Sequence, residues 1–141
     1  MSAVSHANRS RRLSWLRGTA VWPAPADFHD AMLFLETSEE GPPPSAVTRA
    51  LRTYASMGIL RRLSGILFGR PGGAVPIERF TTYDDAILRV VAEEEGLSDL
   101  PIVTNMDFGH TDPMFVLPYG VMAKIDCDNR RFEILESAVV E

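Results

Sequence analysis

The residues best suited to chemistry lie in one irregular segment, residues 105–120. This run, NMDFGHTDPMFVLPYG, contains one histidine, two aspartates, two prolines and two glycines, and is too irregular for a helix. It directly follows residues 100–104 (LPIVT), whose apolar character predicts a short buried strand. Loops just past strand ends often hold the catalytic groups of α/β proteins, so His110 is a candidate general base. A hydrogen-bonded structural histidine is the alternative.

A carboxylate in a similar position comes from an earlier apolar run. Residues 32–35 (MLFL) predict a second buried strand, and Glu36 ends it before polar, turn-forming residues. Such a carboxylate and His110 could meet at one edge of a sheet. In a Ser-His-acid triad the carboxylate orients the imidazole, which takes the proton of the nucleophile. Glu39 and Glu40 compete with Glu36 for this role, and Glu36 could equally be a solvated strand-end residue.

Several strands and helices must position these groups. Apolar runs predict buried strands at residues 31–36, 65–69 and 101–104. Alternating patterns predict strands at residues 121–125 and 132–135, joined as a hairpin. Ser45 is the expected N-cap of a first helix that ends at Gly58, and Thr82 is that of a second, which ends at Gly96. The pattern predicts a mixed α/β fold.

Three of these segments, in their order along the chain, resemble the C-terminal half of the LD-carboxypeptidase family. They are residues 33–39 (LFLETSE), 65–71 (GILFGRP) and 105–120, with residues 15–19 (WLRGT) and the Trp22-Pro23 pair upstream. These serine peptidases include muropeptide LD-carboxypeptidases and microcin C self-immunity proteins. The similarity covers residues 13–141, which we expect to form one domain behind a disordered tail of residues 1–12.

The resemblance implies a fold and an activity. The fold would be a swivelling β/β/α-type domain. The activity would be serine-type hydrolysis of a peptide or amide bond next to a free carboxylate, with Glu36 as the acid and His110 as the histidine of a Ser-Glu-His triad. No cofactor is implied. The substrate is a peptide, and the choice between a muropeptide and a microcin C-like peptidyl-adenylate stays open.

The nucleophile of such a triad is missing from this sequence. In the family it stands in an N-terminal domain, on a strand-to-helix elbow of the Gly-x-Ser-Asp type. The match in this sequence, residues 96–99 (GLSD), closes a predicted helix and does not follow a strand, so no such elbow is expected here. The N-terminal nucleophile domain is therefore expected to be absent, and the partner to be such a domain or a second copy of this chain. The alternative is a non-catalytic binding or assembly module, or a truncated gene product that keeps the fold.

Composition excludes other classes of function. A formal net charge of −5 argues against a nucleic-acid surface, and no apolar run is long enough to span a membrane. The single cysteine, Cys127, and an N-terminus without an apolar signal-peptide core favour the cytoplasm. The three histidines are scattered without metal-ligand spacing, so no metal site is expected.

Two further features allow a structural and a functional interpretation. Residues 69–73 (GRPGG) predict a structural turn, although Arg70 could face the cleft. Asp107 and Asp112 flank His110 and could hydrogen-bond it, but such residues more often hold loop amides.

Overall fold

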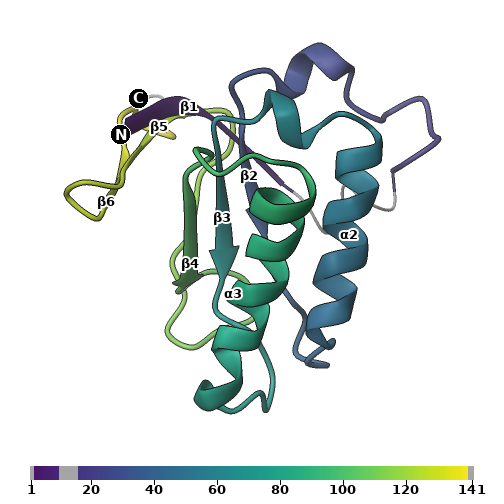
Figure 1. The fold of residues 1–141 in the computed structure, drawn as a ribbon. Coiled ribbons are helices and arrows are strands. Elements are labelled where there is room, and N and C mark those ends of the chain that lie inside the picture. Colours follow the sequence, from purple (N-terminus) through teal and green to yellow (C-terminus); the bar gives the residue numbers. More distant parts are fainter. Residues whose placement is uncertain (1, 10–15, 140–141) are drawn as a thin grey trace.

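A six-stranded sheet forms the centre of the computed structural model, which describes residues 2–9, by their backbone alone, and residues 16–139 (Figure 1). The strands are β1 (Ser2–Arg9), β2 (Met32–Leu35), β3 (Gly65–Gly69), β4 (Ile102–Met106), β5 (Met122–Asp126) and β6 (Arg131–Ile134). Their order across the sheet is β4-β3-β2-β1-β5-β6. β1 to β4 run parallel, whereas β5 and β6 are antiparallel to their neighbours. The carboxyl ends of the parallel strands therefore share one edge.

Two helices lie side by side against one face of the parallel strands (Figure 1). The helical elements are η1 (Pro25–Phe28), α2 (Pro44–Ser56), η2 (Leu60–Arg62), η3 (Ile77–Arg79), α3 (Phe80–Leu88) and η4 (Arg89–Glu94), of which η4 is a π-helical continuation of α3. Both helices are amphipathic. The buried side chains of α2 are Val47, Leu51 and Tyr54.

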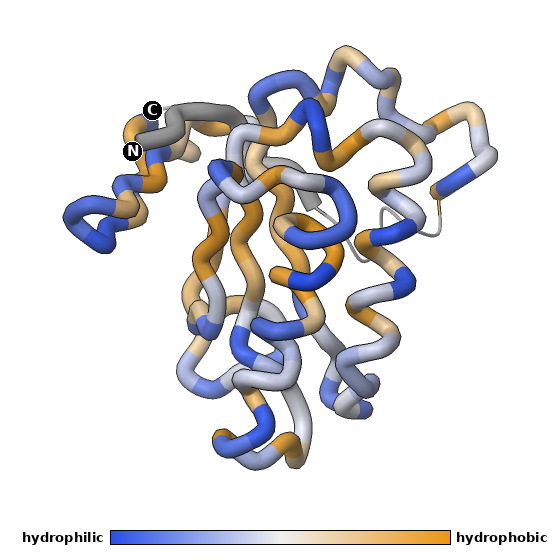
Figure 2. The backbone as a smooth tube through the Cα atoms, in the orientation of Figure 1, coloured by the Kyte–Doolittle hydropathy of each residue, from blue (hydrophilic) through white to orange (hydrophobic). Residues whose placement is uncertain are grey.

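Both faces of the central strands are buried, because side chains alternate between the faces of a strand. Leu33 and Ile66 point into the cluster beneath the helices. Met32 and Leu67 belong to a second cluster on the opposite face, where Phe108 and Ile125 cover them. The tube in Figure 2 is accordingly most hydrophobic along these strands and hydrophilic at the β5–β6 turn. The loop that carries His110 is thus anchored to the core by Phe108.

The sequence predicted the mixed α/β fold, the strands of residues 31–36, 65–69 and 101–104 and the β5–β6 hairpin, and these predictions are confirmed. Gly58 and Gly96 follow their helices with φ of 69° and 70°, the left-handed conformation that favours glycine. β4 continues to Met106, beyond its predicted end at residue 104, and Asn105 adopts a φ of 59° in its last part. Asparagine tolerates this conformation better than most residues.

Both predicted N-caps are wrong. α2 begins at Pro44 after Pro43, and Ser45 lies inside the helix. Proline suits the first helical position because its φ is already helical and its missing N–H needs no partner. α3 begins at Phe80 because η3 leads directly into it, and the Thr82 hydroxyl donates to the Arg79 carbonyl instead.

Residues 2–9, part of the segment expected to be a disordered tail, form strand β1 in the structure. β1 lies between β2 and β5, with Ala7 opposite Met32 and Ser2 opposite Asp126. Its polar composition does not indicate a strand, because the pairing comes from partners far away in the sequence. The rest of the predicted tail, residues 1 and 10–12, lies outside the described residues. The described part of the chain includes no helix long and apolar enough to cross a membrane.

Candidate active site

The two residues proposed from the sequence lie at the same edge of the sheet. Glu36 directly follows β2, and His110 stands four positions after the end of β4. The arrowheads of the parallel strands point to this edge in Figure 1, where the loops after β2, β3 and β4 meet. Ligand and catalytic sites of open α/β sheets characteristically form outside the carboxyl ends of their strands.

His110 lies between two carboxylates. Its Nδ1 atom is 3.4 Å from Glu36 Oε2, and its Nε2 atom is 3.1 Å from Glu39 Oε2. The prediction that Glu36 and His110 meet is confirmed. Among the three acidic candidates, Glu36 faces the nitrogen that an orienting acid would bind, Glu39 faces the other nitrogen, and Glu40 is exposed.

The contact between Glu36 and His110 is an ion-pair approach and not a hydrogen bond. The Glu36 Oε2 atom is buried and forms no hydrogen bond with any described group, and His110 Nδ1 lies 3.4 Å from it. A separation of 3.4 Å is longer than a strong charge-assisted hydrogen bond. Catalytic hydrogen bonds are commonly long without substrate and shorten in the reacting complex. The pair therefore has the arrangement of an acid and the histidine that it orients.

Gly109 makes this approach possible. Its φ is +88°, and a Cβ atom built there would collide with Glu36 Oε2 and lie 2.9 Å from Glu36 Cβ. Any larger residue before the histidine would displace the carboxylate. The sequence pattern indicates the histidine but not this glycine, because the role of Gly109 depends on a close backbone approach that spacing does not reveal.

The predicted turn at residues 70–73 joins the two loops. A Cβ atom at Gly72 would lie 3.0 Å from the His110 carbonyl oxygen and 3.2 Å from that of Ser38. The Gly72 amide donates to Thr37 Oγ1 over 2.9 Å in a buried hydrogen bond. Gly73 has a φ of +72°, and a Cβ there would collide with the Glu39 carbonyl. This turn fixes both the glutamate loop and the histidine loop.

Arg70 binds the histidine loop at two points. Its Nη2 atom lies 2.9 Å from Asp107 Oδ1 and donates to the Asp112 carbonyl oxygen over 3.2 Å. Asp107 therefore meets Arg70 through its carboxylate and Asp112 through its backbone carbonyl, and among the contacts of the described residues neither aspartate hydrogen-bonds His110. In the sequence, Arg70 stood out only as part of the glycine-rich segment 69–73.

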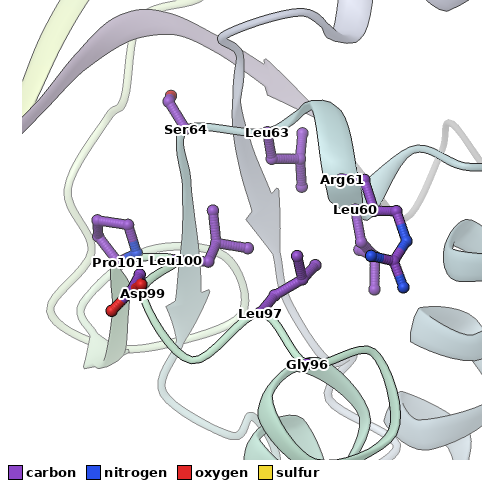
Figure 3. A pocket seen from close by; sticks show the side chains of 9 residues that line it. All are labelled: Leu60, Arg61, Leu63, Ser64, Gly96, Leu97, Asp99, Leu100 and Pro101. Atoms are coloured by element: carbon purple, nitrogen blue, oxygen red, sulfur yellow. The ribbon is translucent and has the colours of Figure 1, made fainter.

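The opposite edge of the sheet is different in character. A cavity of about 370 Å³ opens there, where β3 and β4 begin (Figure 3). Its lining is mainly apolar and includes Leu60, Leu63 and Leu97. Arg61 also lines it, but its guanidinium pairs with Glu95 at 2.9 Å. Neither Glu36 nor His110 contributes to this cavity. In the described part of the chain, no group of three or more His, Cys, Asp or Glu residues could hold a metal ion.

Comparison with known proteins identifies related sequences and folds. The sequence model of the LD-carboxypeptidase C-terminal domain matches residues 10–125. A predicted carboxypeptidase of Vibrio cholerae is 30% identical over 110 residues, which cover 73% of this chain and 29% of the relative.

Solved structures share the fold at low sequence identity. An MccF-like protein from Streptococcus pneumoniae, solved with AMP, has a TM-score of 0.73 and 24% identity, covering 96% of this chain and 42% of its own. Muramoyltetrapeptide carboxypeptidase from Oxalobacter formigenes has a TM-score of 0.70 and 20% identity. The match covers 94% of this chain and 45% of that protein. The chain thus spans less than half the length of these relatives, and the predicted swivelling fold of the LD-carboxypeptidase C-terminal half is confirmed.

Proposed function

This chain belongs to the LD-carboxypeptidase family, and we propose that it supplies the histidine and the acid of a serine-type carboxypeptidase. The observation that carries the proposal is the approach of Glu36 Oε2 to His110 Nδ1 at the carboxyl edge of the parallel strands. Neither residue is required to fill the core, since both side chains are partly exposed. Their juxtaposition is better explained by chemistry than by packing.

Each group has a defined part in the proposed reaction. His110 Nε2 would take the proton of a serine hydroxyl as that oxygen attacks the substrate carbonyl. Glu36 would keep the Nδ1 proton directed toward itself and stabilise the imidazolium that forms. His110 would then give the proton to the leaving amine, and water activated by the same nitrogen would release the acyl group.

The nucleophile and the oxyanion donors would come from residues outside this sequence. They would belong either to another polypeptide or to a further part of the same protein, because the Gly-x-Ser-Asp match of this sequence, residues 96–99, connects η4 to β4 and is not a strand-to-helix elbow. The partner we propose is an N-terminal nucleophile domain of the family. We further propose a reducing compartment such as the cytoplasm, because the one cysteine of the sequence, Cys127, is free.

Two substrate classes fit this family. One is a muropeptide, as the name of the Oxalobacter formigenes structure indicates for that protein. The other is a peptidyl nucleotide, since an MccF structure was solved with glutamyl sulfamoyl guanosine. Both carry an acyl group for transfer to serine. We propose a peptide or amide bond beside a free carboxylate as the shared chemistry.

Reconstitution tests the proposal. The purified chain is mixed with the N-terminal part of a family relative, and release of D-alanine from a tetrapeptide muropeptide is measured, with an aminoacyl sulfamoyl nucleotide as a competing ligand. We expect no turnover from the chain alone and turnover from the mixture. His110→Ala should abolish that turnover and Glu36→Gln should lower it by about 10⁴-fold, as loss of a triad acid does in other enzymes.

Glu40→Gln is the matched control, because it makes the same acid-to-amide change at an exposed position in the same loop. It should leave the rate unchanged. Turnover that survives both His110→Ala and Glu36→Gln would refute the assigned roles. Association of the two parts without any hydrolysis would instead favour the non-catalytic assembly module.

A further inference from the structure

We propose that Glu39 is a positioning residue that holds His110 in a resting form until the nucleophile engages. This inference rests on the proposed function, because it concerns the nitrogen that would receive the serine proton. In the structure that nitrogen, Nε2, lies 3.1 Å from Glu39 Oε2, closer than Nδ1 lies to Glu36. Glu39 thus occupies the position from which a serine hydroxyl would approach.

The chemistry of imidazole distinguishes the resting form from the active one. A neutral imidazole has one N–H donor and one lone pair, and both nitrogens donate only in the imidazolium. A carboxylate accepts hydrogen bonds and can pair with Nε2 only where that atom carries a proton. A general base needs the lone pair of Nε2 instead. Engagement would require Glu39 to move away and the Nε2 proton to pass to solvent.

The two carboxylates differ in how firmly they are held. Glu36 has a 31% exposed side chain that lies against Gly109. The Glu39 side chain is 70% exposed, although its backbone lies in the turn closed by the Gly41 amide and the Ser38 carbonyl oxygen. Exposed ion pairs are weak and are readily exchanged. We therefore expect Glu36 to keep its contact with His110 when the nucleophile engages, and Glu39 to lose its contact.

The nearby cation does not compete with His110 for the Glu39 carboxylate. Arg70, the nearby cation of the adjoining turn, pairs with Asp107 at 2.9 Å. Among the described residues, the ion pair of Glu39 is the one with His110. In the part of the chain that the structure describes, the imidazole of His110 is therefore the ion-pair partner of the Glu39 carboxylate.

Chemical acylation of the full chain tests the resting contact without requiring turnover. Diethyl pyrocarbonate transfers an ethoxycarbonyl group to a neutral imidazole nitrogen, with loss of ethanol and carbon dioxide. The rate at His110 is followed by peptide mass mapping, with His29 as the internal reference because it pairs with Asp30 away from the site. Glu39→Ala should raise the His110 rate about two- to fivefold, the range that corresponds to an exposed ion pair.

Two controls accompany this measurement. Glu40→Ala removes the same charge from the next residue and should leave the His110 rate unchanged. High salt should raise the rate of the unchanged chain toward that of Glu39→Ala, because salt screens exposed pairs. A Glu39→Ala rate no different from that of Glu40→Ala would overturn the proposal.

The reconstituted enzyme separates this inference from the proposed function. Glu39→Ala should match or exceed the unchanged chain in turnover, in the opposite direction from Glu36→Gln. If Glu39→Ala were as damaging as Glu36→Gln, Glu39 would be part of the catalytic machinery and the resting role would be wrong. If His110→Ala and Glu36→Gln had no effect, the proposed function itself would fail, whatever the acylation rates.

Discussion

The two edges of the parallel strands have opposite constructions. At the carboxyl edge, loops after β2, β3 and β4 are locked together by close backbone contacts at Gly72 and Gly109 and by the guanidinium of Arg70. At the amino edge, leucine side chains surround a cavity of about 370 Å³. The first edge has small residues and directed polar groups, and the second has mainly apolar side chains around an open pocket. The comparison indicates that the close contacts and directed hydrogen bonds of these loops lie at the edge where charged side chains approach one another.

The largest effect on stability should follow from filling the space beside Glu36. Gly109→Ala places a methyl group against the Glu36 carboxylate at a φ of +88°, so we expect a loss of about 3 kcal/mol, near the upper range for single substitutions. Gly96→Ala is the control, because its φ is +70° with nothing within 4 Å. It should cost only about 1 kcal/mol. Urea unfolding measures both, and equal losses would show that the contact with Glu36 carries no weight.

A cavity-forming change at the amino edge should be somewhat smaller and should leave the carboxyl edge intact. Leu60 is 1% exposed and lines the pocket, so Leu60→Ala should cost about 2 kcal/mol, the low end for a buried leucine, because it borders an open pocket into which neighbouring side chains can relax. The rate of His110 acylation should not change in the folded variant. A changed rate would mean that the two edges are coupled through the sheet.

The two arginines offer a matched comparison of the edges. Arg70→Ala releases both anchor points of the histidine loop, so amide hydrogen exchange in residues 107–112 should become about tenfold faster, which corresponds to about 1.4 kcal/mol. Arg61→Ala removes the pair with Glu95 at the amino edge and should leave those amides unchanged. Amide exchange rates of the two variants can be measured by mass spectrometry or NMR. Equal behaviour of the two variants would contradict a clamp by Arg70.

The smallest effect is expected in the β5–β6 hairpin, apart from both edges. Hydrogen bonds from the Asn129 side chain and backbone lower the pKa of Asp126 below its usual 3.8. A lowered folded-state pKa stabilises the protein above the usual value, and that contribution is lost as the pH falls through the lowered pKa. Asn129→Ala should therefore destabilise the chain slightly at pH 6 and less at low pH. Urea midpoints at both pH values test this, and a deficit that grew in acid would contradict it.

The sequence predicted the parts of the site that depend on residue type and strand order. Apolar runs ending at Glu36 and leading toward His110 predicted two strands. The structure shows that both run parallel to β3, so their carboxyl ends share an edge. Spacing could not distinguish Glu36 from Glu39, because the choice depends on which nitrogen each carboxylate reaches. That distance is set by Gly109 and by the turn at Gly72, which are tertiary contacts.

The missed features have the same origin. β1 has a polar sequence and gains its place from pairing with β2 and β5. Arg70 was noticed only as a possible cleft residue, because the two anchor points of its guanidinium lie far along the chain. Local patterns predict elements well, whereas these contacts arise only when the elements are assembled.

The central claim is that Glu36 and His110 act as one catalytic unit. The most direct test is a double-mutant cycle in the reconstituted enzyme, comparing His110→Ala, Glu36→Gln and the two together. Residues that work as a unit give strongly non-additive losses. We predict that the double variant is no slower than His110→Ala alone. Losses that multiply, with each substitution lowering kcat by its full factor in the presence of the other, would contradict the account.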